Sequence, residues 1–138
     1  IFDQRNSLYF RSFALVSRFL DLAEYFAEAT NDDIQEVLDD HKFHVDNHDA
    51  IFATSDSVMR KRFMAVKASG VLEHVTLRKT QAQARKYGFE VQSNNGKIVF
   101  PSEKREAKAL LRLLLEGYYE GPFTGNKYMT NSQKRVEE

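Results

Sequence analysis

Apolar positions along this chain recur mostly at the spacing of an α-helix. The longest such run begins at Ser7 and ends at Ala29, and its polar residues form a single narrow stripe. A helix with so wide an apolar arc is buried on most sides. Four further helices are expected, each with a capping residue, a closing glycine or a buried edge: residues 33–38, 57–69, 76–87 and 102–117.

A β-hairpin is the clearest local prediction. Residues 89–100 alternate between apolar and polar types on either side of Asn95–Gly96, a pair that favours a two-residue type I′ turn. That turn places Val91 and Phe100 on one face with Phe89 and Ile98. Residues 42–53 alternate only weakly, which indicates at most a short strand there.

Length and composition indicate one globular domain of the α+β class. The chain has 138 residues, 42% of them hydrophobic, and no cysteine, so neither disulfides nor thiol chemistry are expected. No apolar run approaches the roughly 20 residues that cross a bilayer. We expect a helix-rich single domain over residues 1–138, with about five helices and a small antiparallel β-sheet or hairpin, forming the C-terminal part of a longer protein.

Charge is distributed unevenly although the net charge is zero. Residues 1–57 hold four Lys or Arg against twelve Asp or Glu, and residues 58–138 hold sixteen against eight. Such asymmetry indicates one face for basic partners and another for anions. Mutual attraction of the two halves within one fold explains it equally well.

A basic stretch follows in the second half, where residues 60–86 contain eight Lys or Arg and the single acid Glu73. Two helices and then a hairpin is also the element order of a winged helix, in which the second helix enters the major groove. Lysine and arginine neutralise phosphates, and Gln81, Gln83 and Arg85 are types that read base edges. The predicted nucleic-acid-binding residues are Arg60, Lys61, Arg62, Lys67, Arg78, Lys79, Gln81, Arg85 and Lys86. The alternative is a solvated basic face that balances the acidic half.

No catalytic or cofactor motif is present. His41, His44 and His48 lie among aspartates, but their spacing matches no metal signature. Glu90–Val91–Gln92 faintly resembles a nuclease strand and lacks its lysine. We therefore expect no catalytic residues, no metal site and no cofactor, and a binding protein rather than an enzyme.

The C-terminal segment holds a turn motif, Gly121–Pro122–Phe123–Thr124–Gly125, in which two glycines and a proline define the path of the chain. The aromatic residues around it are expected to anchor this segment on the core: Tyr118, Tyr119, Phe123 and Tyr128.

This motif and its surroundings resemble the C-terminal portion of the Kiwa KwaB-like family of anti-phage defence proteins. The shared features are Ile98–Val99–Phe100, the leucine-rich run 110–115, Tyr118 and Tyr119, Pro122 to Gly125, Tyr128, Ser132 and Lys134–Arg135. Residues 56–75, with Gly70–Val71–Leu72, and the opening Ser7–Leu8–Tyr9–Phe10 are also similar. Gln133 departs from the pattern, because a basic residue is expected directly after Ser132.

The resemblance implies a bacterial anti-phage defence component that binds DNA and works in the cytoplasm beside a small membrane-protein partner. Two alternatives stay open. One is a protein-interaction module without nucleic-acid binding, which forms a homodimer through the helix at residues 7–29. The other is a metal-dependent nuclease.

Overall fold

The computed structural model describes residues 26–129, which form five α-helices and two small β-sheets. The helices are α2 (Asn31–Leu38), α3 (His48–Thr54), α4 (Ser57–Ser69), α5 (Leu77–Lys86) and α6 (Lys104–Leu114), with a short 3-10 helix, η2, at Val71–His74. The strands are β1 (Phe43–His44), β2 (Ser93–Asn94), β3 (Lys97–Val99), β4 (Tyr118–Glu120) and β5 (Lys127–Met129). The prediction of a helix-rich α+β domain is confirmed.

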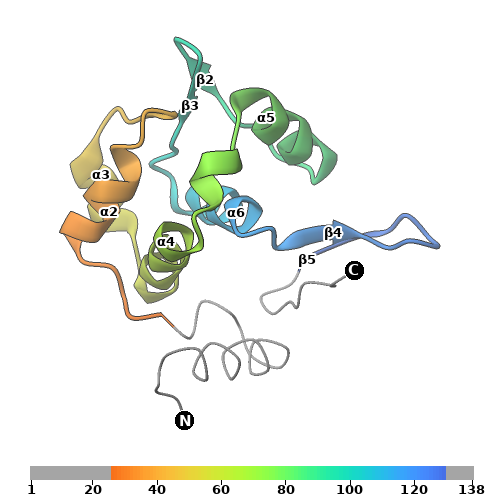
Figure 1. The fold of residues 1–138 in the computed structure, drawn as a ribbon, viewed down its shortest axis with the longest axis horizontal. Coiled ribbons are helices and arrows are strands. Elements are labelled where there is room, and N and C mark those ends of the chain that lie inside the picture. Colours follow the sequence, from red (N-terminus) through yellow and green to blue (C-terminus); the bar gives the residue numbers. More distant parts are fainter. Residues whose placement is uncertain (1–25, 130–138) are drawn as a thin grey trace.

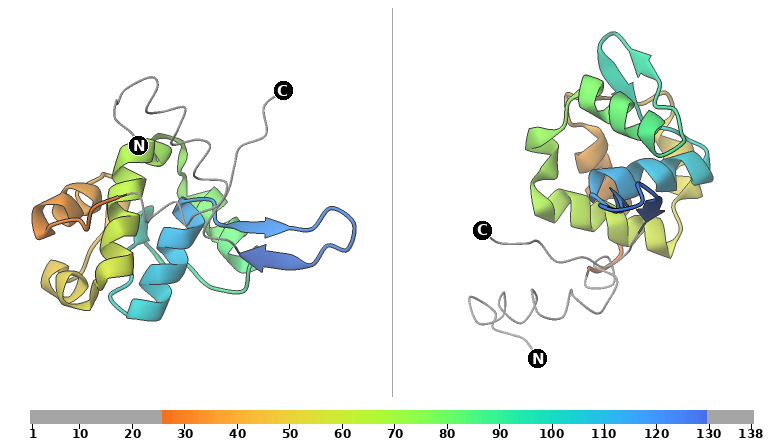
Figure 2. Two further views of the ribbon diagram at one scale, coloured as in Figure 1. Left: turned by 90° about the horizontal axis from the view of Figure 1, so that it is seen from below. Right: turned by 90° about the vertical axis from the view of Figure 1, so that its right-hand side faces the viewer.

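Helices α4 and α6 occupy the centre of the fold. α2 packs against α4, α4 against α6, and α6 against α5. Consequently α2 and α3 lie on one side of the molecule, and α5 lies on the other with the β4–β5 hairpin (Figure 1). The hairpin extends away from the body in the left view of Figure 2, and in the right view it points toward the viewer. We call this hairpin, residues 118–129, the arm.

The core forms where the apolar stripes of these helices meet the first sheet. Phe100 is 1% exposed, stacks on Phe63 with ring centroids 5.5 Å apart, and meets Phe43 edge-on at 5.7 Å. α4 and α6 contribute the stripes predicted for them: Met59, Phe63 and Val66, and Ala107, Leu110, Leu111 and Leu114. Burial of these side chains is the main stabilising contribution to the fold.

The hairpin at Asn95–Gly96 is present in the predicted register. Both turn residues have positive φ, 52° and 77°, as a type I′ turn requires. Ser93 pairs with Ile98, and Val91, Ile98 and Phe100 are all buried. The sheet is larger than predicted and is not purely antiparallel, because β1 joins β3 in parallel, with Phe43 opposite Ile98.

Three predictions about local structure were wrong. Residues 48–54 form helix α3, which the weak alternation of that segment did not indicate, although the short strand did form at Phe43–His44. Residues 26–30 are not helical, so the first predicted helix does not reach Ala29; the rest of it lies outside the described residues. Of the four aromatic residues expected to anchor the C-terminal segment, only Tyr118 does so, because it stacks on Tyr87 at 5.0 Å.

Asp56 links the first turn of α4 to α6. Its carboxylate accepts the backbone N–H of Met59 at 2.9 Å and contacts the ammonium groups of Lys108 at 2.8 Å and Lys104 at 3.5 Å. Burial raises the pKa of this carboxyl group, but the hydrogen bonds from Lys108 and Met59 outweigh that effect and lower it from 3.8 to about 2. The ionised form is therefore favoured by folding.

A carboxyl group with a lowered pKa in the folded state stabilises the protein above its unfolded pKa of 3.8, and this stability is lost as the pH falls towards about 2. Urea unfolding should show that Asp56→Asn, which keeps the cap acceptor, flattens the decline in unfolding free energy between pH 5 and pH 2. Asp56→Ala should in addition lose about 1 kcal/mol at pH 7 through loss of the cap. An unchanged decline in Asp56→Asn would show that another carboxylate dominates acid unfolding.

Candidate nucleic-acid interface

The basic stretch is divided between an interior helix and a surface helix. α4 is capped at its start by Asp56 and closed by Gly70 at φ 73°, and it places its apolar stripe in the core. Arg62 on this helix is only 6% exposed, so its guanidinium group belongs to the interior. Lys61 is half-buried, and among residues 26–129 its side chain has no hydrogen bond or ion pair.

Arg60 connects three segments of the fold. Its guanidinium group donates to the carbonyl oxygens of Ala29 at 2.8 Å, Phe52 at 3.0 Å and Ser55 at 3.1 Å, and to Asn31 Oδ1 at 2.9 Å. The fork geometry of arginine suits several acceptors at once. The structure therefore uses Arg60 to hold α3 and the segment before α2 against α4.

Three other predicted contacts are also engaged within the fold. Lys67 forms ion pairs with Glu36 at 2.9 Å and Asp33 at 3.1 Å, and these hydrogen bonds, that of Glu36 first, raise the pKa of Lys67. Gln81 Nε2 donates to the carbonyl oxygen of Val91 at 3.0 Å. Lys86 pairs with Glu120 of the arm at 3.2 Å. The pairs of Lys67 show that the acidic and basic halves do meet within one fold.

Arg78, Lys79 and Arg85 remain, all on α5 and all exposed. None of these side chains has a hydrogen bond or ion pair within the described part of the chain. Thr76 caps α5, and its side chain accepts the N–H of Lys79; the helix buries only Thr80 and Ala84. Because the helix contains no acid, every charged side chain on its exposed side is positive. We call Arg78, Lys79, Arg85 and Lys86 the basic face of α5.

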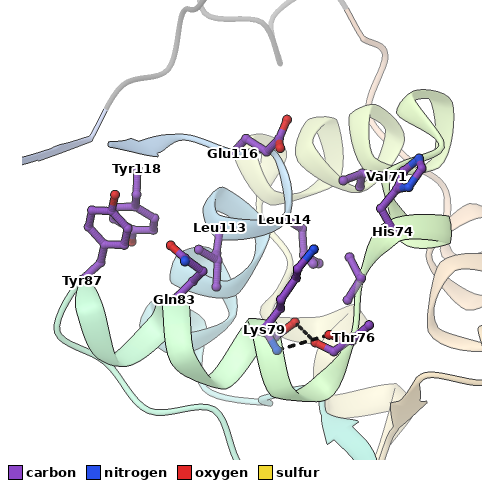
Figure 3. A pocket seen from close by; sticks show the side chains of 12 residues that line it. Val71, His74, Thr76, Lys79, Gln83, Tyr87, Leu113, Leu114, Glu116 and Tyr118 are labelled. Carbon is purple, nitrogen blue, oxygen red and sulfur yellow. Dashed lines mark hydrogen bonds between the residues drawn. The ribbon is translucent and has the colours of Figure 1, made fainter. Parts of the chain in front are cut away.

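A groove runs between α5 and the opposing elements η2 and α6. It has a volume of about 310 Å³, and one end is closed by the stacked rings of Tyr87 and Tyr118. In Figure 3, Lys79 and Gln83 extend from α5 towards Leu113 and Leu114 of α6. This places a cation and an amide that has no hydrogen bond among the described residues at the edge of the basic face. The tyrosine pair was not predicted, since its partners are 31 positions apart in the sequence and no local pattern joins them.

The element order expected of a winged helix is present, namely α4, α5 and then the β2–β3 hairpin. The link between the two helices contains η2, and Lys97 is exposed on β3 of the hairpin. Within residues 26–129, no group of three or more His, Cys, Asp or Glu residues could hold a metal ion. His44 instead meets Asp46 at 2.8 Å.

Comparison with known proteins decides the family. The family described as Kiwa protein KwaB-like matches residues 1–124, which include every described helix and strand except β5. This chain belongs to the Kiwa KwaB-like family. No curated protein and no solved structure matches it.

Membership in the Kiwa KwaB-like family makes this domain an anti-phage defence component of a system with several components. The resemblance seen in the sequence is thereby confirmed. Among the described residues of this KwaB-like chain, no helix is long and apolar enough to cross a membrane. Helix α5 and the arm both lie on the side of the fold opposite α2 and α3 (Figure 1).

Proposed function

We propose that this domain is a non-enzymatic DNA-binding component of Kiwa-type defence and that the basic face of α5 contacts the phosphates. The observation that carries the proposal is the presence of three exposed cations, Arg78, Lys79 and Arg85, without partners among the described residues, on a helix without an acid. Elsewhere in the basic stretch, Arg60 and Lys67 are committed to other parts of the fold.

The spacing of these cations suits a phosphate backbone. Arg78 and Arg85 are seven residues apart, which is about 10 Å along a helix axis with a rise of 1.5 Å per residue. The phosphates of one strand repeat about every 3.4 Å along the duplex axis, so an α5 that lies along this axis spans about three of them. Phosphate contacts bind without reading sequence, whereas Gln83 and Arg85 on the same helix are types that read base edges.

Fluorescence anisotropy of labelled DNA across a salt series tests the proposal. The triple variant Arg78→Gln, Lys79→Gln, Arg85→Gln should bind roughly ten- to a hundredfold more weakly at low salt, and the log–log salt slope should shrink by about three. Arg105→Gln is the control for Arg85→Gln, because Arg105 is equally exposed and free of partners within residues 26–129 but lies on α6. Equal affinity of the triple variant and the unaltered chain would refute the assignment.

A protein-interaction module is the second candidate function. Four of the five exposed large hydrophobic residues in the described part of the chain lie on the arm, which favours a contact with another protein. Dimerisation through residues 7–29 remains a prediction, and residues 7–25 of this segment lie outside the described part of the chain. Light scattering at high concentration tests it, since a strict monomer would contradict it.

The family resemblance also supports a cytoplasmic location and a small membrane-protein partner, which we include in the proposal. Co-purification of the tagged chain with the membrane fraction, in cells with and without the proposed membrane-protein partner, tests this association.

A metal-dependent nuclease is the candidate function with the least support. It would be tested by DNA cleavage that depends on an added divalent cation.

A further inference from the structure

The groove between α5 and the opposing elements η2 and α6 combines an apolar lining with a polar rim. Its volume of about 310 Å³ is at the lower end of the range for small-molecule pockets, about 300–1,000 Å³. Leu113 and Leu114 of α6 and Val71 of η2 supply apolar surface, and the rings of Tyr87 and Tyr118 stand at one end (Figure 3). The groove therefore suits a small ligand with an apolar body and polar edges.

Four polar side chains around this groove have no hydrogen bond or ion pair among the described residues: His74, Lys79, Gln83 and Glu116. In Figure 3, Lys79 and Gln83 come from α5, and Glu116 lies across the groove from them. Together these three side chains offer an ammonium donor, an amide that both donates and accepts, and a carboxylate acceptor. A nucleobase carries complementary donors and acceptors on its edges around an apolar ring.

Glu116 reaches the rim through an unusual backbone conformation. Its φ is 60°, in the left-handed region that residues other than glycine seldom adopt. Helices often end on a glycine in this conformation, but here the glycine, Gly117, follows one position later. The N–H of Glu116 donates to the carbonyl oxygen of Leu113 at 2.9 Å, which fixes the conformation. Such strained residues cluster at ligand sites, and this one supplies the groove with its carboxylate.

The groove adjoins the basic face of α5. Lys79, Gln83 and Tyr87 follow each other at intervals of four residues, so they share one side of the helix. Arg78 and Arg85 lie on the neighbouring, solvent-exposed side, and Lys79 stands where the two sides meet. A DNA strand whose phosphates contact Arg78 and Arg85 therefore has its bases within reach of the groove. A paired base is held in the duplex stack, so only an unpaired base can turn into the groove.

We propose that this groove receives one unpaired nucleobase of a DNA strand whose phosphates lie on the basic face of α5. The ring of the base lies beside the tyrosine pair and the leucines of α6, and Lys79, Gln83 and Glu116 meet its edge. The inference rests on the proposed DNA binding and adds to it a preference for DNA with single-stranded ends or gaps. Every base has an aromatic face, so the preference is for the unpaired state rather than for one sequence.

Fluorescence anisotropy with three DNAs that share one duplex tests the proposal. The first is blunt, the second carries a short single-stranded overhang, and the third carries an overhang of equal length made of abasic sites. The abasic overhang keeps the phosphates and lacks the bases, so the ratio of the two overhang affinities isolates the contribution of the base. The intact overhang should bind roughly five- to a hundredfold more tightly than the abasic one, the usual range for a base on an aromatic side chain.

Two variants of the groove should lower this affinity ratio towards one. Tyr87→Leu removes one ring of the stacked pair, and its matched control is Tyr119→Leu, which removes a ring from the stacked pair on the arm and should leave the ratio unchanged. Glu116→Gly removes the carboxylate and places a glycine where the backbone favours one. In urea unfolding this variant should be at least as stable as the unaltered chain, so a lower ratio cannot be attributed to misfolding.

Photochemical cross-linking locates the base directly. An overhang that contains 5-iododeoxyuridine should cross-link to Tyr87 or Tyr118, as mapped by mass spectrometry. The proposal is overturned if the cross-link maps to residues that do not line the groove, or if Glu116→Gly and Tyr87→Leu both keep the full ratio. If the intact and abasic overhangs bind equally while the blunt duplex binds with the expected salt slope, the groove is not a base site and the phosphate contacts of α5 stand. If none of the three DNAs binds, both proposals are refuted.

Discussion

Replacing Phe100 with alanine is expected to lower the free energy of unfolding by about 3–5 kcal/mol, the usual cost of removing a buried aromatic ring. Phe100 is the point where the first sheet meets α4. Its ring touches both Phe63 and Phe43, and its backbone N–H donates to the carbonyl oxygen of His44 at 2.9 Å. A cavity at this position therefore separates the sheet from the helices. The total free energy of unfolding of a native domain is only about 5–15 kcal/mol. The variant should therefore be close to unfolded at 37 °C.

The matched control is Phe123→Ala, the same change at a side chain that is 98% exposed. Urea unfolding with circular dichroism, at concentrations where the chain is monomeric, should show a stability within about 0.5 kcal/mol of the unaltered protein. If both variants lost similar stability, Phe123 would be packed within the monomer and the description of the arm would be wrong. If neither did, the cluster around Phe100 would not be the core.

Local signals in the sequence were sufficient for much of the fold. Asp56 and Thr76 cap the helices that were predicted to follow them, and Gly70 adopts the left-handed conformation expected at a helix end. Asn95–Gly96 determined both the turn and the register of its hairpin. In each case the physical cause lies within four residues, and a single sequence contains that information.

Long-range partners could not be predicted in the same way. The sequence shows that a lysine or arginine is charged, but it does not show which groups the side chain contacts. Arg60 donates to the carbonyl oxygen of Ala29, and Lys67 pairs with Asp33, both about 30 positions away. Helix α3 was missed because its seven residues bury only Ile51, which gives no helical period. The aromatic residues of the arm were read as anchors because such side chains are usually buried, whereas the hairpin leaves Tyr119 and Tyr128 stacked on each other and exposed.

The positions of these side chains also change the expected effect of substitutions in the basic stretch. The sequence predicted Arg60, Lys61 and Arg62 as nucleic-acid-binding residues, and on that prediction neutralising them would reduce the affinity for DNA. In the structure Arg62 is buried and Arg60 is bound by four acceptors, so neither presents a charge that a phosphate could approach freely. Their contribution is to stability, and the affinity for DNA is expected to depend on α5.

Arg60→Ala should therefore lower the free energy of unfolding by about 2–4 kcal/mol, because it leaves partly buried acceptors without the donor that satisfied them. Arg60→Lys is the decisive variant. Lysine keeps the positive charge but lacks the fork that reaches the carbonyl oxygens of Ala29 and Phe52 together. If Arg60 served DNA through its charge, lysine would restore binding and stability would be unaffected by either change. We expect the opposite result in urea unfolding and anisotropy. Both variants should be destabilised, and the folded fraction of each should bind DNA with the affinity and salt slope of the unaltered domain.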